Sequence, residues 1–364
     1  MLHEAPPLFT FEPSASRVAD DARALMLVDP GFGRVFTDHM AIAHYSVDKG
    51  WHDARITARR PLTIDPATSV LHYAQEIFEG MKAYRRPEGR FALFRAEANA
   101  RRFQASARRM AMPELPETIF LESIRSLVRA DKAWIPDSED GALYLRPFMF
   151  ASEVFLGVKP ATEYLYIVMA SSVGAYFKGA PSVSLWVTRD YARAGPGGTG
   201  EAKCGGNYAT SLIAQAEAIK NGCDQVVFLD AVERRWVEEL GGMNIFFVFE
   251  DGSIATPPLG GTILHGITRD SILTLARDAG IGVREEPVSI EQWEADARSG
   301  RLTEAFACGT AAVVTPISRV KSADGEFAIG GQSAGPLTQR LREMLVAIQR
   351  GQAPDPRGWI EELS

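Results

Sequence analysis

The sequence contains one lysine in surroundings that could make it reactive. Lys203 lies in the stretch GGTGEAKCGGNYATS, among glycines, and Tyr208 follows five residues later. Small neighbours allow a bulky planar ligand to come close, and an amine buried beside such a ligand is favoured in its neutral, nucleophilic form. The setting therefore indicates a Schiff base with a cofactor. Tyr208 could then bond an oxygen of the cofactor's ring, although a core tyrosine is an equally good interpretation of this stretch alone.

A phosphate-binding loop for a nucleotide is excluded by spacing. The Walker pattern places lysine directly after its second glycine and Ser or Thr next. Counted from Gly195, the sixth position is Gly200, but Glu201 follows it and Cys204 follows Lys203. No GxGxxG motif follows a predicted strand either, so a dinucleotide-binding fold has no support. A surface lysine in a flexible loop is the remaining alternative, and the small neighbours and the apolar pattern downstream weigh against it.

A pyridoxal cofactor would make two further demands on the chain. It needs a carboxylate at the ring nitrogen, and VEELGGMNIFF offers Glu238 and Glu239, of which only a buried one could serve. It also needs a phosphate site, for which a helix N-terminus is well suited. The stretch GGTILHGITRDSILTLARDAG leads from a loop into a helix with Ile267 and Thr268 at its start. A plain N-cap at Thr268 is an alternative that is compatible with phosphate binding.

Five blocks of the sequence together resemble one enzyme family. They are LHYAQEIFEGMKAYR, KCGGNYATSLIAQAEAIKNGCDQVVFLD, VEELGGMNIFF, LGGTILHGITR and FACGTAAVVTPI. In this order they resemble the branched-chain amino acid aminotransferases, which are class IV aminotransferases of pyridoxal-phosphate fold type IV. The resemblance runs from FGRVFTDHM to the C-terminal helix. It implies reversible transfer of the amino group of L-leucine, L-isoleucine or L-valine to 2-oxoglutarate by a ping-pong mechanism, as the last step of synthesis or the first step of degradation of these amino acids.

The resemblance implies a role for each residue that would hold pyridoxal 5'-phosphate. Lys203 corresponds to the catalytic lysine, which carries the cofactor and moves a proton between the substrate α carbon and C4'. Tyr208 corresponds to the tyrosine at the ring hydroxyl, and Glu239 to the carboxylate at the pyridine nitrogen. The phosphate contacts correspond to Arg102, Ile267, Thr268 and Thr310.

The resemblance also implies a substrate pocket. Its aromatic walls, which would bury a branched aliphatic side chain, correspond to Phe32, Tyr73, Phe78, Tyr144 and Tyr176. Thr310 and Ala311 correspond to a turn that holds the substrate carboxylate, and Arg146 to an arginine that serves the longer acidic substrate. Leu156 and Val158 correspond to a loop given by the neighbouring subunit, so a homodimer, or a higher oligomer, is expected.

Two departures and three alternatives accompany the resemblance. Gly242 stands where mammalian members have threonine, and Ala312 and Thr315 stand where they have a CxxC pair, so no thiol switch is expected. A D-amino acid aminotransferase and an aminodeoxychorismate lyase share the fold, but LHYAQEIFEGMKAY and YLRP weigh against both. A non-catalytic cofactor-binding protein would require Lys203 to be unmodified.

The elements that must position these residues mix strands and helices without strict alternation. Strands are predicted at 36–51, which enters a hairpin through a Lys-Gly turn, and at 90–95, 142–152, 163–172, 183–188, 225–230 and 244–249. Glu-Asp-Gly after the last of these strands favours a second hairpin. Helical faces are predicted for Phe103, Ala107 and Met110, for Phe120, Ile124, Leu127 and Val128, for Leu212, Ala216 and Ile219, and for Ile272, Leu275 and Ala279. This mixture predicts an α+β fold with substantial antiparallel sheet.

Two domains are predicted for a chain of 364 residues. We expect a smaller N-terminal α/β domain at 1–173 and an interdomain loop at 174–184, where glycines and a proline interrupt the pattern. A larger C-terminal domain at 185–364, with a mixed and largely antiparallel sheet, would then carry Lys203. The resemblance implies the same two-domain arrangement.

The composition excludes several classes of protein. Hydrophobic residues make up 46% of the chain, which is ordinary for a globular protein. The formal net charge of -7 argues against nucleic-acid binding, and the arginines at 101, 102, 108 and 109 mostly suit a solvated helix face. The three cysteines have no CxxC spacing, so neither disulfides nor a metal site are expected. Without a basic leader or a run of ~18 apolar residues, we expect a cytoplasmic protein that binds no membrane.

Overall fold

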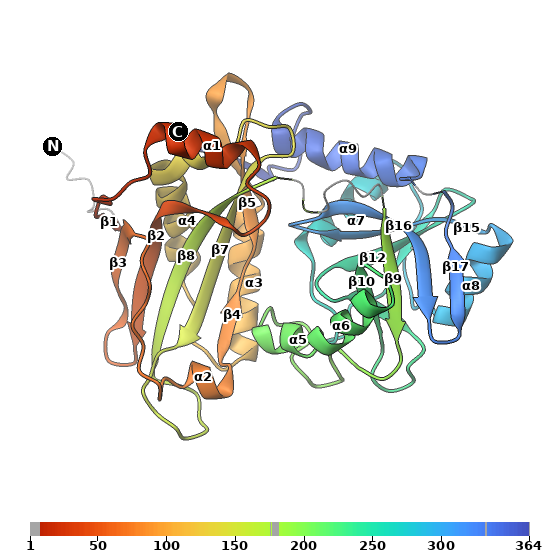
Figure 1. Cartoon of the computed structure of the whole chain (residues 1–364), viewed down its shortest axis with the longest axis horizontal. Helices are drawn as coiled ribbons and strands as arrows, with labels where there is room; N and C mark the ends of the chain where they lie inside the picture. Colours follow the sequence, from red (N-terminus) through yellow and green to blue (C-terminus); the bar gives the residue numbers. More distant parts are fainter. Residues whose placement is uncertain (1–7, 175, 177–181, 332, 364) are drawn as a thin grey trace. The chain divides into compact units, whose positions relative to one another are not determined.

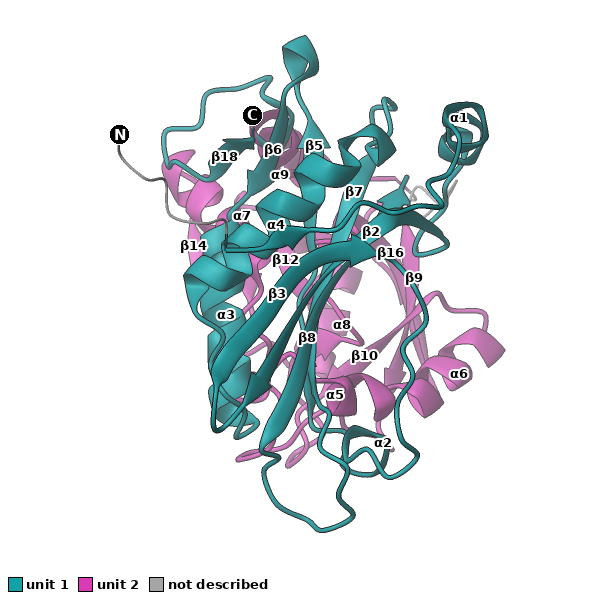
Figure 2. Ribbon diagram, turned by 90° about the vertical axis from the view of Figure 1, so that its left-hand side faces the viewer, with its two compact units in different colours: residues 1–176, 349–364 teal, residues 177–348 magenta. Residues whose placement is uncertain are grey.

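A computed structural model describes residues 8–174, 176, 182–331 and 333–363. The chain divides into two compact units, which Figure 1 colours along the sequence and Figure 2 colours separately. Unit 1 comprises residues 1–176 and 349–364, and unit 2 comprises residues 177–348.

Unit 1 is built on one sheet with helices packed against it. Its helices are α1 (Asp20–Val28), α2 (Val70–Tyr73), α3 (Ala96–Arg109) and α4 (Glu117–Asp131), with short 3-10 turns η1 (Pro87–Gly89) and η2 (Lys132–Trp134). Its strands are β1 (Thr10–Phe11), β2 (Val35–Ser46), β3 (Gly50–Ala58), β4 (Glu76–Phe78), β5 (Met81–Arg85), β6 (Phe91–Phe94), β7 (Ala142–Ala151), β8 (Glu163–Val173) and β18 (Ile360–Leu363). The strand order is β1-β3-β2-β8-β7-β5-β6-β18, and β4 pairs with β7. α4 packs on β2, β3 and β8, and α3 packs on α4.

The sheet of unit 1 confirms the predicted hairpin and the later strands. β2 and β3 pair in an antiparallel ladder, and Gly50 at the turn has φ of 66°, a conformation that glycine adopts without strain. β7 and β8 pair along their whole length, from Ala142 opposite Val173 to Ala151 opposite Tyr164. Among the described strands of this sheet, only β1 and β3 run parallel to one another.

Unit 2 is built on a second, mixed sheet. Its strands are β9 (Val183–Thr188), β10 (Gln225–Leu229), β11 (Val237–Leu240), β12 (Asn244–Phe249), β13 (Ile254–Thr256), β14 (Val283–Glu285), β15 (Leu302–Gly309), β16 (Val313–Ser322) and β17 (Gly325–Ala328). Its helices are α5 (Gly205–Ala209), α6 (Leu212–Lys220), α7 (Ile267–Asp278), α8 (Ile290–Ser299) and α9 (Pro336–Arg350), the last of which ends in unit 1. The order is β11-β10-β9-β16-β15-β12-β13-β14, with β17 beside β16. Most described pairs are antiparallel, and β9 is parallel to both neighbours.

The continuous apolar run NIFFVF follows from the cover on both faces of this sheet. Ile245 and Phe247 belong to a core cluster that contains Trp293 of α8. Phe246 and Val248 alternate with them and belong to a second cluster, with Ile272 and other residues of α7. A strand covered on both faces needs no polar alternation. The predicted hairpin after this strand is confirmed, because β12 and β13 pair in antiparallel fashion.

The division into units differs from the predicted domain ranges at two places. Residues 349–364, which we expected in the second domain, belong to unit 1, because β18 pairs with β6. Unit 1 is therefore the longer of the two. β9 begins at Val183, inside the predicted interdomain loop of 174–184, and residues 175 and 177–181 of that loop lie outside the described part of the chain.

The predicted face of the helix after Tyr208 is not the buried one. Leu212 and Ile219 are 68% and 66% exposed, whereas Ala214 and Ala218 are fully buried. These alanines pack on Val226 and the neighbouring core of β10. Small residues at i and i+4 let the helix approach the sheet closely, so the larger side chains face outward.

No helix in the described ranges is long and apolar enough to cross a membrane.

Candidate active site

The loop that carries Lys203 is fixed by a buried asparagine on α5. The side-chain amide of Asn207 donates to the carbonyls of Thr199 and Ala202, both at 2.8 Å, and its Oδ1 accepts from the Thr199 hydroxyl at 2.8 Å. Asn207 is only 3% exposed. The backbone immediately before Lys203 is therefore held in place by the side chain of Asn207, which follows four residues later.

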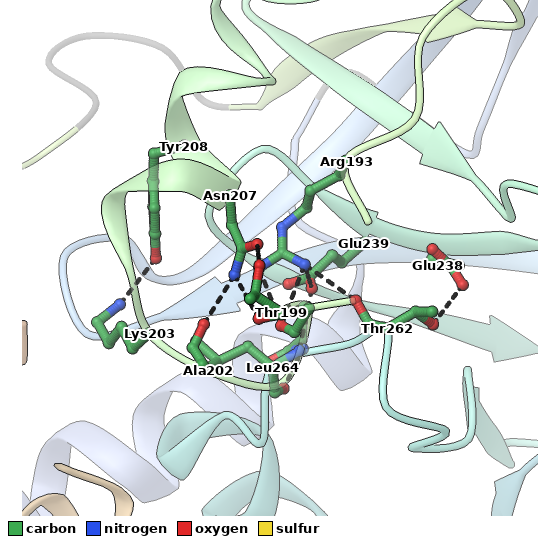
Figure 3. Close-up of polar contacts among 12 residues, drawn as sticks. Arg193, Thr199, Ala202, Lys203, Asn207, Tyr208, Glu238, Glu239, Thr262 and Leu264 are labelled. Atoms are coloured by element: carbon green, nitrogen blue, oxygen red, sulfur yellow. Dashed lines mark hydrogen bonds and ion pairs between the residues drawn. The ribbon is translucent and has the colours of Figure 1, made fainter. Parts of the chain in front are cut away.

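Lys203 and Tyr208 point toward one another, as Figure 3 shows. Nζ of Lys203 donates to the hydroxyl of Tyr208 at 2.9 Å. The short helix α5 brings the tyrosine back to the lysine, because it turns the chain between them. The structure thus brings together the amine and the phenol that the sequence singled out, and both side chains are half-buried.

Burial distinguishes the two glutamates of β11. Successive residues of a strand face opposite sides, and Glu239 is 2% exposed while Glu238 is half-buried. Glu239 accepts the N–H of Leu264 at 3.0 Å and pairs with Arg193, whose Nη1 lies 2.7 Å from Oε1. Burial raises the pKa of Glu239 to about 7, and the Arg193 charge and the Leu264 N–H oppose that rise. Glu239 is the buried carboxylate that a pyridine ring would need.

Arg193 is a residue of this site that the sequence reading missed. It lies in the loop after β9, is 4% exposed, and contacts Glu239 across a large separation in sequence. A buried carboxylate needs a partner of opposite charge. The position of Arg193, two residues before the glycine-rich stretch, could therefore have indicated it as the partner of Glu239.

Two glycines connect Tyr208 to the turn between β15 and β16. A Cβ at Gly242 would lie 3.4 Å from Cε1 of Tyr208, so the backbone at this position packs beside the phenol ring. A Cβ at Gly309 would lie 3.8 Å from the carbonyl oxygen of Gly242. Thr310 and Ala311 follow directly in the turn. Thr310 and Ala311 therefore lie close in sequence to Gly309, whose neighbour Gly242 packs beside the Tyr208 ring.

The start of α7 lies at the same end of the sheet. Ile267 and Thr268 are its first two residues, after the N-cap Gly266. A Cβ at Gly266 would lie 1.9 Å from Oδ1 of Asn244, so a side chain at this position would displace the Asn244 amide. Asn244 is paired with Cys308, just before the β15–β16 turn. The first N–H groups of a helix have no acceptor within it and favour an anion.

Arg102, the predicted phosphate contact from unit 1, is held by a buried glutamate. Its Nε and Nη2 donate to the two carboxylate oxygens of Glu79 at 2.7 and 2.8 Å. Glu79 is fully buried and also accepts from the Asn99 amide at 2.8 Å. A pair with two parallel bonds fixes the plane of the guanidinium.

Four of the predicted pocket aromatics in unit 1 form one cluster with the predicted arginine, which contacts two of them, Phe78 and Tyr144. The ring of Phe32 lies 5.0 Å from that of Tyr144 and 4.9 Å from that of Tyr176. The guanidinium of Arg146 lies 4.8 Å from the Phe78 ring, and its Nη2 donates to the Tyr144 hydroxyl at 3.0 Å. This cluster combines apolar walls with one positive charge.

The remaining predicted substrate residues of unit 1 lie in α2 and in the loop after β7. The hydroxyl of Tyr73 donates to the carbonyl of Leu156. Leu156 is 60% exposed and Val158 is 87% exposed. These two apolar side chains therefore face outward from the chain that carries them.

Comparisons with known proteins agree on one family. The family model of the class IV aminotransferases matches residues 76–320. A probable branched-chain-amino-acid aminotransferase of Streptomyces coelicolor is 56% identical over 98% of this chain and 99% of its own length. The branched-chain-amino-acid aminotransferase of Mycolicibacterium smegmatis is 52% identical over the full length of both chains.

Solved structures of the same family share the fold. The branched-chain amino acid aminotransferase of Escherichia coli matches with a TM-score of 0.75 at 28% identity, over 90% of this chain and 99% of that chain. The enzyme of Thermobaculum terrenum, solved in its PLP form, matches with a TM-score of 0.71 at 27% identity, over 89% and 98%. The buried carboxylate, the lysine with its tyrosine and these full-length matches lead to one conclusion: the chain belongs to the branched-chain-amino-acid aminotransferases, within the class IV aminotransferase family.

Proposed function

We propose that this chain catalyses the reversible transfer of the amino group of L-leucine, L-isoleucine or L-valine to 2-oxoglutarate, with pyridoxal 5'-phosphate bound at Lys203. The observation that carries the proposal is the 2.9 Å contact between Nζ of Lys203 and the hydroxyl of Tyr208, beside a buried Glu239. Full-length relatives with the same named activity support it.

The chemistry of the residues present fits pyridoxal phosphate. The ring nitrogen of the cofactor needs a carboxylate, and Glu239 is buried with one cationic partner. The phosphate needs N–H donors and a cation, for which Ile267, Thr268 and Thr310 of unit 2 and Arg102 of unit 1 are the candidates. When bound, the cofactor supplies an electron-withdrawing ring that stabilises negative charge at the substrate α carbon.

Each residue would then have a defined role. Lys203 would hold the cofactor, and its Nζ would move the α proton of the amino acid substrate. Tyr208 orients Nζ through the hydrogen bond between them and would hold the ring hydroxyl. Glu239 would hold the ring nitrogen by a hydrogen bond and keep its proton in place.

The substrate side chain is assigned to the aromatic cluster of unit 1. Apolar walls favour a branched aliphatic side chain because burial releases water from both surfaces. Arg146 is assigned to the γ-carboxylate of 2-oxoglutarate or glutamate, because its guanidinium is the cation inside this cluster. Tyr73 is assigned to the same side-chain pocket, and Thr310 with Ala311 to the α-carboxylate.

A homodimer is part of the proposal. The loop after β7 exposes Val154, Phe155, Leu156 and Val158, each of them more than 40% exposed. Apolar side chains gathered in one loop favour contact with another chain, and we assign that contact to a second copy. Sedimentation of the purified protein at the mass of a single chain would contradict this assignment.

The test is an assay of glutamate formation from L-leucine and 2-oxoglutarate with added pyridoxal phosphate. Lys203→Ala is expected to lower kcat by roughly 10³-fold or more, because the proton-transferring amine is lost. Lys220→Ala removes an exposed lysine at the end of α6 and serves as the matched control, with unchanged rates expected. Full activity of the Lys203→Ala variant would sink the proposed role.

A further inference from the structure

Arg193 joins three segments of the site in unit 2. Its Nη1 lies 2.7 Å from Oε1 of Glu239 on β11, and donates to the carbonyls of Thr262 at 3.0 Å and Gly200 at 3.3 Å. Figure 3 shows the guanidinium directed at Glu239 and Thr262. Gly200 lies three residues before Lys203, so one side chain contacts both the lysine loop and the carboxylate.

The lysine loop and the Thr262 segment touch through their backbones. A Cβ at Gly200 would lie 2.4 Å from the carbonyl oxygen of Thr262. The carbonyl groups of both residues accept from the same guanidinium, which satisfies them away from water. Arg193 is also anchored itself, because the hydroxyl of Thr210 donates to its carbonyl at 3.2 Å.

The charge of Arg193 acts on a carboxyl group that burial would otherwise neutralise. The side chains of Arg193 and Glu239 are 2% and 3% exposed. The other charged groups that act on Glu239 are Glu238, which favours its neutral form, and Lys203, which favours its charged form. Removing the cation from such a pair leaves a buried negative charge without compensation, and protonation relieves it.

We propose that Arg193 is a positioning residue, which holds the Glu239 carboxylate charged and in the orientation needed by a pyridine nitrogen, and which ties that carboxylate to the Lys203 loop. The inference rests on the proposed function, because Glu239 has this task only if the pyridoxal ring binds here. Arg193 itself acts through Glu239 and is assigned no contact with substrate or cofactor.

The test is a double-mutant cycle on the full-length protein with four variants. Arg193→Met removes the charge, Arg193→Lys retains it without the guanidinium fork, and Glu239→Gln removes the partner charge. The fourth variant combines Arg193→Met with Glu239→Gln. Arg189→Met is the control, because Arg189 lies four residues earlier, is 44% exposed and pairs on the surface with Glu291.

Three results are expected. Arg193→Met lowers kcat/KM for leucine roughly 100-fold, because a misplaced group at an active site costs about that much. In the protein that already carries Glu239→Gln, the same substitution lowers kcat/KM by less than about 3-fold, because the two residues act as one unit. The acidic limb of the pH profile of kcat/KM moves up by about one unit or more in Arg193→Met, and the pH titration of the bound cofactor's visible absorption band moves with it. Arg193→Lys restores most of the limb's position, and Arg189→Met leaves every reading unchanged.

Additive losses in the cycle, or a pH profile that does not move in Arg193→Met, would overturn the inference. If Arg193→Met does not fold, Arg193→Lys carries the same test. Lysine keeps the positive charge but lacks the planar guanidinium, so kcat/KM should fall if the guanidinium orients Glu239. An unchanged kcat/KM in Arg193→Lys would overturn that orienting role. Urea unfolding of the same variants separates this inference from the proposed function. If wild-type protein shows no transamination, the proposed function fails, whereas additive unfolding free energies would show that Arg193 and Glu239 are not coupled at all.

Discussion

At the scale of single residues, the candidate site contains a buried carboxyl group whose ionisation is costly. Glu239 is 2% exposed, and its pKa lies at about 7 rather than the ordinary 4.5. Between these two values the folded protein binds a proton that the unfolded chain has released. The contribution of Glu239 to the free energy of unfolding of the cofactor-free protein therefore falls as the pH rises through this window.

Glu239→Gln is expected to remove this pH dependence. The difference in unfolding free energy between variant and wild type should shift in favour of the variant from pH 4.5 to pH 7, by on the order of 3 kcal/mol. Urea unfolding of the cofactor-free protein at several pH values measures it. A difference that stays constant across the window would mean that Glu239 titrates as in the unfolded chain.

Arg146→Ala tests the proposal that one pocket accepts two kinds of substrate side chain. The guanidinium stacks on Phe78 and bonds Tyr144, so it presents a cation within an aromatic wall. Losing a charge-assisted bond costs about 1.5–3 kcal/mol, which predicts a KM for 2-oxoglutarate that rises roughly 10- to 100-fold while that for leucine changes much less. Steady-state kinetics with each substrate varied would refute the assignment if both KM values rose equally.

The sequence placed Lys203 and Tyr208 together but did not predict the partner of Glu239. Lys203 and Tyr208 are five positions apart, so local reasoning joined them, and the structure places their polar atoms 2.9 Å apart. The sequence alone did not show which of Glu238 and Glu239 is buried, and the structure shows that it is Glu239. Arg193 escaped because a loop has no periodicity and its partner lies in a distant strand.

At the scale of elements, the contact between the lysine loop and the Thr262 segment depends on a missing side chain. Gly200→Ala would place a Cβ 2.4 Å from a backbone oxygen that cannot rotate away. The expected result is a loss of roughly 1–3 kcal/mol in unfolding free energy and lower cofactor occupancy. Gly260→Ala is the control, because a Cβ there meets nothing within 4 Å, and a change below about 0.5 kcal/mol is expected. Equal stability of the two variants, measured by urea unfolding, would contradict the close contact.

The existence of elements was predictable where the apolar pattern was strong. β7, β8 and β12 follow from apolar runs of strand length, and α7 from its spacing of Ile272 and Leu275. The orientation of α6 was not, because its largest apolar side chains are exposed and two alanines make the contact. Helical spacing fixes which residues share a face, but the sheet decides which face fits.

At the scale of the whole molecule, the chain ends in the unit where it began. β18 completes the edge of the unit 1 sheet beside β6, and Arg125 and Arg90 pair with Glu361 and Glu362 of that strand. The pairing of strands so far apart in sequence leaves no local pattern. For this reason the predicted C-terminal domain, 185–364, wrongly included β18.

Removing residues 357–364 is expected to weaken unit 1. The deletion exposes the edge of β6 and removes Trp359, which packs on Phe94 with ring centroids 5.7 Å apart. Loss of the half-buried Trp359, the buried Leu363 and the β18 ladder should lower the unfolding free energy by roughly 2–5 kcal/mol. Glu362→Ala, which removes only half-exposed ion pairs, should cost less than about 1 kcal/mol. Urea unfolding that is unchanged by the deletion would show that β18 does not stabilise the unit.

The absorption spectrum of the purified protein, taken before and after adding L-leucine and then 2-oxoglutarate, tests the central claim most directly. We predict a visible band of the bound cofactor that changes with leucine and returns with 2-oxoglutarate. The Lys203→Ala variant should lack this band, because the lysine that would hold the cofactor is missing. A band that leucine leaves unmoved, or one that responds to D-alanine instead, would contradict the assignment of this site to branched-chain amino acids.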